Sequence, residues 1–240
     1  VVSAGGDGTV EAVVKATQGK LPVAIFPLGT ENLLAKYLKL KADPKKTLDM
    51  IALNRRIQFD AGMANSEIFS IMLSVGFDAD VVRRVHDQRR GNITHLAYAK
   101  PILQSIWNYN YPRLQVEWLD GSDWKQIDCH WAFVFNAPAY AAGLKIVSDG
   151  TPTDGVFELA TFAGGSFWQG LQQFGAVLLR QHQRLPGFQL NRTKHIRIRS
   201  AQEQVAYQYD GDPGGVLPVE IRVLPKYLTL LVDESFGGPI

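Results

Sequence analysis

The stretch Val1-Val2-Ser3-Ala4-Gly5-Gly6-Asp7-Gly8-Thr9 decides how the start of this chain folds. Its first four residues predict a short buried strand. After Thr9 the apolar residues return at helical spacing, at Val10, Val13, Val14 and Thr17. A glycine-rich turn between a strand and a helix predicts a βα unit.

The turn Gly5-Gly6-Asp7-Gly8-Thr9 is a candidate anion cradle. Its three glycines leave backbone N–H groups open to close approach by phosphate, and the N-terminus of the next helix adds a favourable partial charge. Asp7 would repel a bare phosphate, so its presence indicates a Mg²⁺ or a bound water shared between carboxylate and nucleotide. The alternative is an ordinary tight βα turn in which Asp7 caps the helix.

A second βα unit follows the same plan. It has a predicted strand at Val23–Phe26, the turn Pro27-Leu28-Gly29, and a helix capped by Thr30 that buries Leu33, Leu34, Tyr37 and Leu38. A third helix is predicted from Pro44 to Ala52. Residues 1–54 therefore predict an α/β nucleotide-binding lobe with a parallel sheet.

Residues 55–240 have a different sequence pattern, in which short apolar segments rich in β-favouring residues are separated by turns of Gly, Asp, Asn and Pro. This pattern predicts a mainly antiparallel β-sandwich or open barrel with inserted helices. The predicted strands are Arg56–Met63, Ile68–Val75, Leu114–Trp118, Trp131–Asn136, Val156–Phe162, His195–Arg199, Val219–Val223 and Tyr227–Val232. The predicted helices are Asp78–His86, Thr94–Tyr109 and Phe167–Gln181.

Composition limits the classes of function. The 240 residues carry a formal net charge of +2, too near balance to require nucleic acid as a partner. The single cysteine, Cys129, indicates a reducing, cytoplasmic setting. The five histidines lack ligand spacing, which argues against zinc. The longest apolar run, Trp131–Leu144, is interrupted by Asn136 and Pro138, so any membrane contact is expected to be peripheral. Because the chain opens inside a strand, we also expect further residues before Val1.

Two common phosphate-binding signatures are absent, namely G-x-x-x-x-G-K-[S/T] and G-x-G-x-x-G. The pair formed by Gly5-Gly6-Asp7-Gly8-Thr9 and Pro27-Leu28-Gly29-Thr30-Glu31-Asn32 instead resembles the nucleotide motifs of diacylglycerol and sphingoid-base kinases. That resemblance implies ATP and Mg²⁺ as cofactors and an NAD-kinase-like nucleotide lobe, incomplete in this chain. Where the family's second loop reads Gly-Thr-x-Asn-Asp, this chain has Leu33 in the last position. The nucleotide-binding residues implied are Gly5, Gly6, Asp7, Gly8, Thr9, Gly29, Thr30 and Asn32.

The resemblance extends along the chain. Arg56–Gly62, Ser74–Ala79, and the later Asn136, Gly143 and Asp154-Gly155-Val156-Phe157 are similar to family segments. In some bacterial members the Asp-Gly turn holds a structural Mg²⁺, which makes Asp154, with the carbonyls of Thr151 and Val156, a metal candidate. A plain hairpin turn is the alternative.

Tyr209-Asp210-Gly211-Asp212 matches the family's late acidic turn. By resemblance Asp212 is the catalytic general base, Asp7 completes the catalytic pair, and Asp7 and Asp210 are metal candidates. The sequence does not decide between the two aspartates of the turn, and in isolation Asp210-Gly211 is simply a good hairpin turn.

The resemblance implies an ATP-dependent lipid kinase that acts on diacylglycerol or a related lipid alcohol. Basic and aromatic residues between Arg83 and Tyr111 could contact the lipid, or form a solvated helix face beside a core cluster. A homodimer is compatible with the sequence. Two alternatives stay open, a non-catalytic nucleotide- or lipid-binding module and a kinase of a soluble substrate such as NAD. The Asn-x-Gly-x-x-Gly-Phe segment of NAD kinases is missing.

Overall fold

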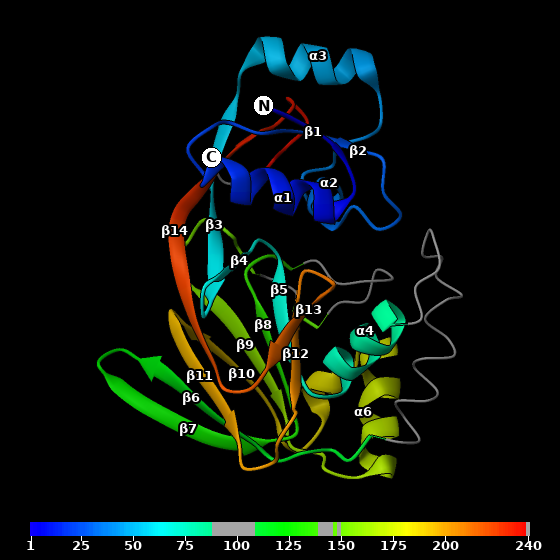
Figure 1. Ribbon diagram of the computed structural model, residues 1–240, viewed down its shortest axis with the longest axis vertical. Helices are drawn as coiled ribbons and strands as arrows, with labels where there is room; N and C mark the ends of the chain where they lie inside the picture. Colours follow the sequence, from blue (N-terminus) through cyan, green and yellow to red (C-terminus); the bar gives the residue numbers. More distant parts are fainter. Residues whose placement is uncertain (88–108, 139–145, 148–149, 239–240) are drawn as a thin grey trace.

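The structure is a computed structural model that describes residues 1–87, 109–138, 146–147 and 150–238. Most of the expected helix Thr94–Tyr109 lies outside these residues, as does Gly143. The described part forms a small α/β lobe above a larger β-sandwich lobe (Figure 1).

The α/β lobe contains the two predicted βα units. Strands β1 (Val2–Gly5) and β2 (Ala24–Pro27) pair in parallel, with Gly5 opposite Pro27. Helix α1 (Asp7–Thr17) follows β1 and buries Val10 and Val14. The short helix α2 (Leu33–Tyr37) follows β2. Helix α3 (Pro44–Leu53) is capped by Asp43, whose carboxylate accepts from two backbone N–H groups of the first turn.

The larger lobe is a sandwich of two antiparallel six-stranded sheets. We call them sheet I and sheet II. In spatial order sheet I contains β4 (Glu67–Phe69), β3 (Arg56–Ala64), β14 (Val219–Leu231), β11 (His195–Ser200), β6 (Leu114–Asp120) and β7 (Asp123–Cys129). Sheet II contains β10 (Phe188–Thr193), β9 (Phe157–Phe162), β8 (Trp131–Phe135), β5 (Met72–Val75), β12 (Ala206–Tyr209) and β13 (Asp212–Val216).

The two sheets share an apolar core. Alternate residues of each strand face it, for example Val116 on β6, Leu159 on β9 and Ile198 on β11, all fully buried. The opposite face of sheet II is covered by α4 (Phe77–Asp87), α6 (Phe167–Leu178) and the 3-10 turn His182–Arg184, through a second cluster that includes Phe162 and Val177. The predicted fold class, an α/β lobe plus a mainly antiparallel sandwich with inserted helices, is confirmed.

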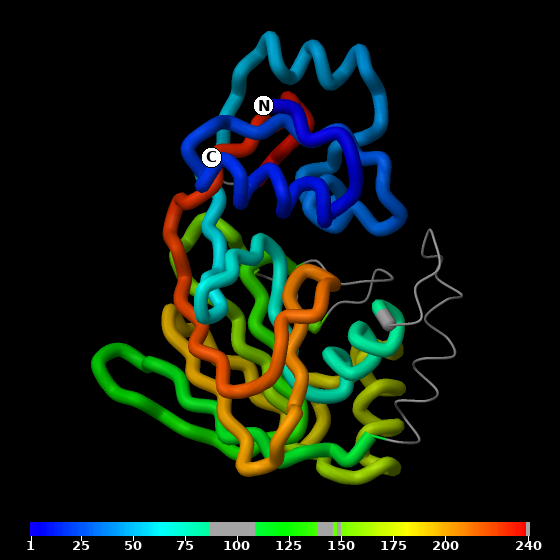
Figure 2. Tube along the Cα trace, viewed as in Figure 1, coloured from blue at the N-terminus to red at the C-terminus, as the bar shows by residue number. Residues whose placement is uncertain are grey.

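Strand β14 joins the two lobes. Its end runs from the sandwich into the α/β lobe (Figure 2). There Leu230 forms a parallel bridge with Val23, the residue before β2. Leu230, Val232 and Phe236 pack in the same cluster as Val10 of α1, so the end of the chain completes the core of the α/β lobe. The sequence predicted two strands here. The structure has one, with an irregular register between Leu224 and Leu228.

Other strand boundaries also differ from the prediction. The single strand expected at Ile68–Val75 is divided into β4 in sheet I and β5 in sheet II. Ser70 and Ile71 form the crossing between the sheets. Strands β7, β10, β12 and β13 are missing from the predicted strands. Five of the seven residues of β7 are exposed, and apart from Trp124 these are polar or charged, which removes the apolar alternation.

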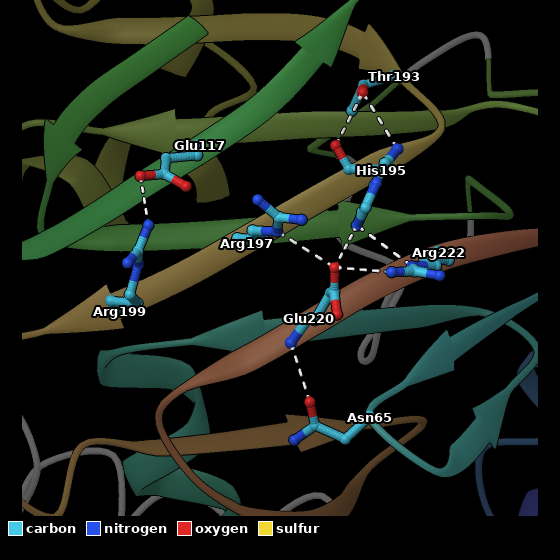
Figure 3. A network of polar contacts seen from close by, with 8 residues as sticks. All are labelled: Asn65, Glu117, Thr193, His195, Arg197, Arg199, Glu220 and Arg222. Carbon is cyan, nitrogen blue, oxygen red and sulfur yellow. Dashed lines mark hydrogen bonds and ion pairs between the residues drawn. The ribbon is translucent and has the colours of Figure 1, made fainter. Parts of the chain in front are cut away.

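The outer face of sheet I carries a network of charged side chains (Figure 3). Glu220 accepts from His195, Arg197 and Arg222 at 2.6, 3.1 and 3.0 Å. The Arg222 guanidinium and its neighbours lower the pKa of Glu220 to about 2. These side chains lie on neighbouring strands of a solvated sheet face, where they pair across the strands.

We expect Phe59→Ala to lower the free energy of unfolding by about 3–5 kcal/mol, because the Phe59 ring is fully buried and packs edge-on against Tyr37 at 5.9 Å. Urea denaturation would measure the change. Leu48→Ala on the exposed side of α3, where Leu48 is 67% exposed, is the control and should stay within about 0.5 kcal/mol of the parent. Equal losses in the two variants would contradict the placement of Phe59 between the lobes.

Candidate active site

The two glycine loops of the α/β lobe touch through their backbones. A Cβ built on Gly29 would lie 2.5 Å from the Cα of Gly6, which is closer than any real contact allows. Asn32 holds the second loop in shape, because its Oδ1 accepts from the Gly29 N–H at 2.9 Å and its Nδ2 donates to the Gly29 carbonyl at 2.6 Å. The predicted nucleotide residues of both turns are therefore brought together at one edge of the β1–β2 sheet.

Asp7 connects these loops. Its carboxylate accepts from the backbone N–H groups of Leu33 at 3.0 Å and Leu34 at 3.4 Å, which are the first residues of α2. The sequence predicted Thr30 as the cap of this helix. That prediction is wrong, because Asn32 is the N-cap residue and the capping oxygens come from Asp7. Burial raises the pKa of Asp7, and the two N–H donors oppose the rise.

Leu33, where the family has an acidic residue, thus contributes its backbone to the site. The N–H of Leu33 donates to Asp7, and its side chain packs against the core of the lobe. The side-chain carboxylate that the family places here is replaced by an apolar contact.

Asp212 lies against the first glycine loop although it is far away in the sequence. A Cβ built on Gly8 would be 4.0 Å from Oδ2 of Asp212. Gly8 and Thr9 are exposed in the first turn of α1, at the helix end whose partial positive charge favours anions, although the Thr9 N–H already donates to the Gly6 carbonyl at 3.0 Å. The carboxylate of Asp212, from the sandwich lobe, therefore lies next to the first turn of α1 in the α/β lobe.

Asp210 has a different position and role. Its two oxygens accept from the backbone N–H groups of Ser70, Ile71 and Met72 at 2.6, 2.9 and 2.9 Å. Desolvation by burial raises the pKa of Asp210 to about 7, against the opposing effect of these donors. Asp210 therefore holds the crossing between β4 and β5, and its predicted role as a metal ligand stays a prediction.

Buried polar side chains around Gln208 also hold the turn at Asp210-Gly211. Gln208 on β12 donates to Ser74 at 2.8 Å and to Asp78 of α4 at 3.0 Å, while its Oε1 accepts from the Gly211 N–H at 3.0 Å. Asp210 and Gly211 both have positive φ, 49° and 92°, as a tight two-residue hairpin turn requires. The hairpin that carries Asp212 is therefore held by the hydrogen bonds of both Asp210 and Gln208.

A cluster that the sequence analysis did not identify joins the lobes beside Asp212. Lys15 of α1 contacts Glu11 at 2.8 Å and Glu67 of β4 at 2.6 Å, and its ammonium lies 5.6 Å from the centre of the Tyr209 ring. Burial raises the pKa of Glu11, and the charge of Asp212 contributes to the rise. The spacing of Glu11 and Lys15, four residues apart on one helix, was the available signal.

Asp154 lies in the turn that precedes β9. It forms an ion pair with Arg192, and its Oδ1 accepts from the Val156 N–H at 3.2 Å. The turn is tied to the sandwich by buried Asp60, which accepts from the N–H groups of Gly155 at 2.7 Å and Lys226 at 2.6 Å. Asp154 is thus not brought together with Asp7 and Asp212, and its role in metal binding stays a prediction.

The described residues contain no cluster of three or more His, Cys, Asp or Glu side chains that could hold a metal ion. Mg²⁺, however, is commonly held by one or two carboxylates together with substrate phosphates. Each oxygen of an ionised carboxylate has a second acceptor site beyond the hydrogen bonds described. Asp7, whose carboxylate lies at the junction of the two glycine loops, is therefore the described residue that would hold a Mg²⁺ arriving with the nucleotide.

The described residues of the Arg83–Tyr111 segment have structural partners. Arg83 and Arg84 pair with Asp80 at 2.8 and 2.6 Å. Tyr109 packs edge-on against Phe77 and Tyr111. The other basic and aromatic residues of this segment, Arg89, Arg90, Lys100 and Trp107, lie outside the described residues.

An α/β lobe with paired glycine loops, set on a two-sheet sandwich whose late aspartate faces those loops, defines a diacylglycerol-kinase-like class of protein. Two family models match the chain accordingly. The YegS C-terminal NAD kinase beta sandwich-like domain matches residues 71–232, and the diacylglycerol kinase catalytic domain matches residues 1–64. The chain belongs to this family, as the resemblance of its motifs predicted.

Individual relatives agree with the family. A Streptococcus pneumoniae protein provisionally named a lipid kinase is 26% identical over 100% of this chain and 79% of its own length. A Staphylococcus carnosus diacylglycerol kinase is 25% identical over 98% of this chain and 77% of its own. A crystal structure of a diacylglycerol kinase from Bacillus anthracis str. Sterne has the same fold, with a TM-score of 0.71 at 18% identity over 98% of this chain and 77% of that chain.

Gly29→Ala should destabilise the protein by about 1–3 kcal/mol, because the new methyl group must separate the two glycine loops. Thermal or urea unfolding would show the change. Gly175→Ala is the matched control, since a Cβ built on this helical glycine meets nothing within 4 Å, and it should be neutral or stabilising. A neutral Gly29→Ala would contradict the backbone contact between the loops.

Asp210→Ala should lower the free energy of unfolding by at least about 2 kcal/mol, because a single buried N–H donor left unpaired already costs about 1–3 kcal/mol. Asp212→Ala, two residues away, should change it by less than about 0.5 kcal/mol. Urea denaturation of both variants separates the two aspartates. If Asp212→Ala proved the more damaging of the pair, the structural role of Asp210 would be wrong.

Proposed function

We propose that this protein transfers the γ-phosphate of ATP to the hydroxyl of a lipid such as a diacylglycerol. The observation that carries the proposal is the placement of the Asp212 carboxylate beside Gly8 at the N-terminus of α1. Phosphoryl transfer needs a site that binds the phosphates and a base that accepts the proton of the attacking hydroxyl. Here the glycine loop and Asp212, the candidates for these two roles, lie side by side. The names of the relatives, lipid kinase and diacylglycerol kinase, support lipid as the acceptor.

The residues of the proposed site have separate roles in binding the nucleotide and activating the lipid hydroxyl. The backbone of Gly5, Gly6 and Gly8, with Thr9, Gly29, Thr30 and Asn32 around it, receives the nucleotide phosphates at the positive end of α1. Asp212 orients the lipid hydroxyl and accepts its proton as the oxygen forms a bond to γ-phosphorus. The bond from that phosphorus to the β–γ bridging oxygen breaks, and ADP leaves. Mg²⁺, when bound by Asp7 with the phosphates, would neutralise part of the phosphate charge.

We further propose that the protein works in the cytoplasm at the surface of a membrane, because its acceptor is a lipid. Among the described residues, no helix has the length and apolarity to cross a bilayer. Contact with the membrane then has to come from the protein surface.

Asp212→Asn should reduce transfer of labelled phosphate from ATP to the lipid by about 10²–10⁴-fold, because the general base is lost while its shape is kept. The assay offers the protein diacylglycerols, sphingoid bases and other lipid alcohols in mixed micelles. The substitution should leave the unfolding curve unchanged.

Glu203→Gln is the matched control, an exposed carboxylate in the loop before β12, and it should retain full transfer. Full transfer in Asp212→Asn would remove Asp212 as the base. Lipid binding without transfer in the parent protein would instead favour a non-catalytic binding module, an alternative that Leu33 in place of an acidic residue keeps relevant.

A further inference from the structure

Helix α6 has an exposed face made of large apolar side chains. Trp168 is 74% exposed, Leu171 42% and Leu178 51%, and Leu179 directly after the helix is 71% exposed. At 100° per residue these side chains project to one side of the helix, together with Gln172. We call this set the α6 face. Isolated exposed leucines are ordinary, whereas an exposed tryptophan with three leucines on one helix marks a contact surface.

The opposite side of α6 is anchored. Gly170, Gln173 and Val177 are buried, and Ser166 caps the first turn by accepting from the Gln169 N–H at 3.4 Å. A Cβ on Gly170 would collide with the hydroxyl of Tyr111 at 2.4 Å, which shows how closely the helix approaches the sandwich lobe. The α6 face is thus presented by a fixed helix in the layer that covers sheet II (Figure 1).

The charged residues nearest to α6 in the sequence are basic. The helix itself contains no charged residue. From Leu159 to Phe188 the sequence has no Asp or Glu, and Arg180 and Arg184 are its only Lys or Arg residues. Arg180 and Arg184 are exposed directly after the helix. A bilayer with anionic headgroups matches both properties, because it offers an apolar interior beneath a negatively charged surface.

We propose that the α6 face is the membrane-docking surface, which inserts Trp168 and its neighbouring leucines among the lipids while Arg180 and Arg184 bind anionic headgroups. Tryptophan is enriched at the level of the headgroups, where its amphipathic ring is favoured. A second copy of the chain fits less well, because a two-fold contact through this face would bring the arginines of both copies together without carboxylates between them. This assignment rests on the proposed lipid substrate.

The fold connects this surface to the site. Helix α4, in the same layer as α6, packs on β5, β12 and β13, and β13 begins with Asp212. Docking through these helices places the bilayer on the helix-covered side of sheet II. The β12–β13 hairpin at the edge of this sheet carries the proposed base, Asp212. A lipid hydroxyl would then have to travel only along the layer of helices to reach Asp212.

The test is sedimentation of the protein with two kinds of vesicle, pure phosphatidylcholine and a mixture with phosphatidylglycerol. Trp168→Ser and Leu179→Ser should each weaken binding to the mixed vesicles about tenfold, as expected for the loss of one inserted large side chain. Arg180→Glu with Arg184→Glu should remove the preference for the mixed vesicles. Trp124→Ser and Leu48→Ser are the matched controls, since these side chains are 41% and 67% exposed on other faces, and they should bind like the parent.

A second measurement separates this proposal from the proposed function. With a short-chain diacylglycerol dissolved as monomers, the α6 variants should transfer phosphate as well as the parent, whereas with lipid in vesicles they should lose activity in parallel with binding. Loss with both substrates, or equal vesicle binding in all variants, would overturn the docking assignment. No transfer by the parent to either substrate would overturn the proposed function instead. A parent dimer that Trp168→Ser converts to a monomer would assign the α6 face to a second copy and reject the membrane.

Discussion

The site depends on one carboxylate that accepts three backbone hydrogen bonds. Asp210 binds the N–H groups of Ser70, Ile71 and Met72 at the point where the chain leaves sheet I for sheet II. Ser70 and Ile71 lie between the two strands, and Met72 begins β5. The carboxylate supplies these three N–H groups with the hydrogen-bond acceptor that buried donors require. The same contact places the β12–β13 turn, and Asp212 with it. The corner of the sandwich and the position of the proposed base are therefore one structural feature.

The α/β lobe uses a carboxylate in a similar way. Asp7 in the first glycine loop caps the helix that follows the second loop, which makes the two turns of the cradle a single unit. The close approach of Gly6 and Gly29 requires the absence of a side chain at both positions. Glycine in these loops thus serves the contact between loops as well as the approach of phosphate.

The lobes are connected on both sides of the site. Strand β14 continues from the sandwich into the core of the α/β lobe, and Lys15 bridges Glu11 of one lobe and Glu67 of the other. Lys15 is only partly buried, so its ion pairs contribute modestly to stability. Their value lies in orientation, because Glu11 and Glu67 sit beside the hairpin that carries Asp212.

The sequence by itself determined the local structure and the family. Glycine turns between apolar runs predicted the βα units, alternating segments predicted most strands of the sandwich, and the paired motifs led to the diacylglycerol-kinase-like family, which the family models confirm. These signals are readable because strand and helix periods and turn residues act over a few neighbouring positions.

Only the tertiary structure decided which groups meet. It showed that the carboxylate of Asp7, and not Thr30, caps α2, and that Ile68–Val75 is divided between two sheets. It also distinguished Asp210, which holds the β4–β5 crossing, from Asp212, although the sequence does not decide between these two aspartates. It also revealed Lys15 and Gln208 as supports of the site. The physical reason is that contacts such as those of Asp7 with Leu33 and of Asp210 with Ser70, 26 and 140 positions apart, depend on how the elements pack, and no local pattern records that packing.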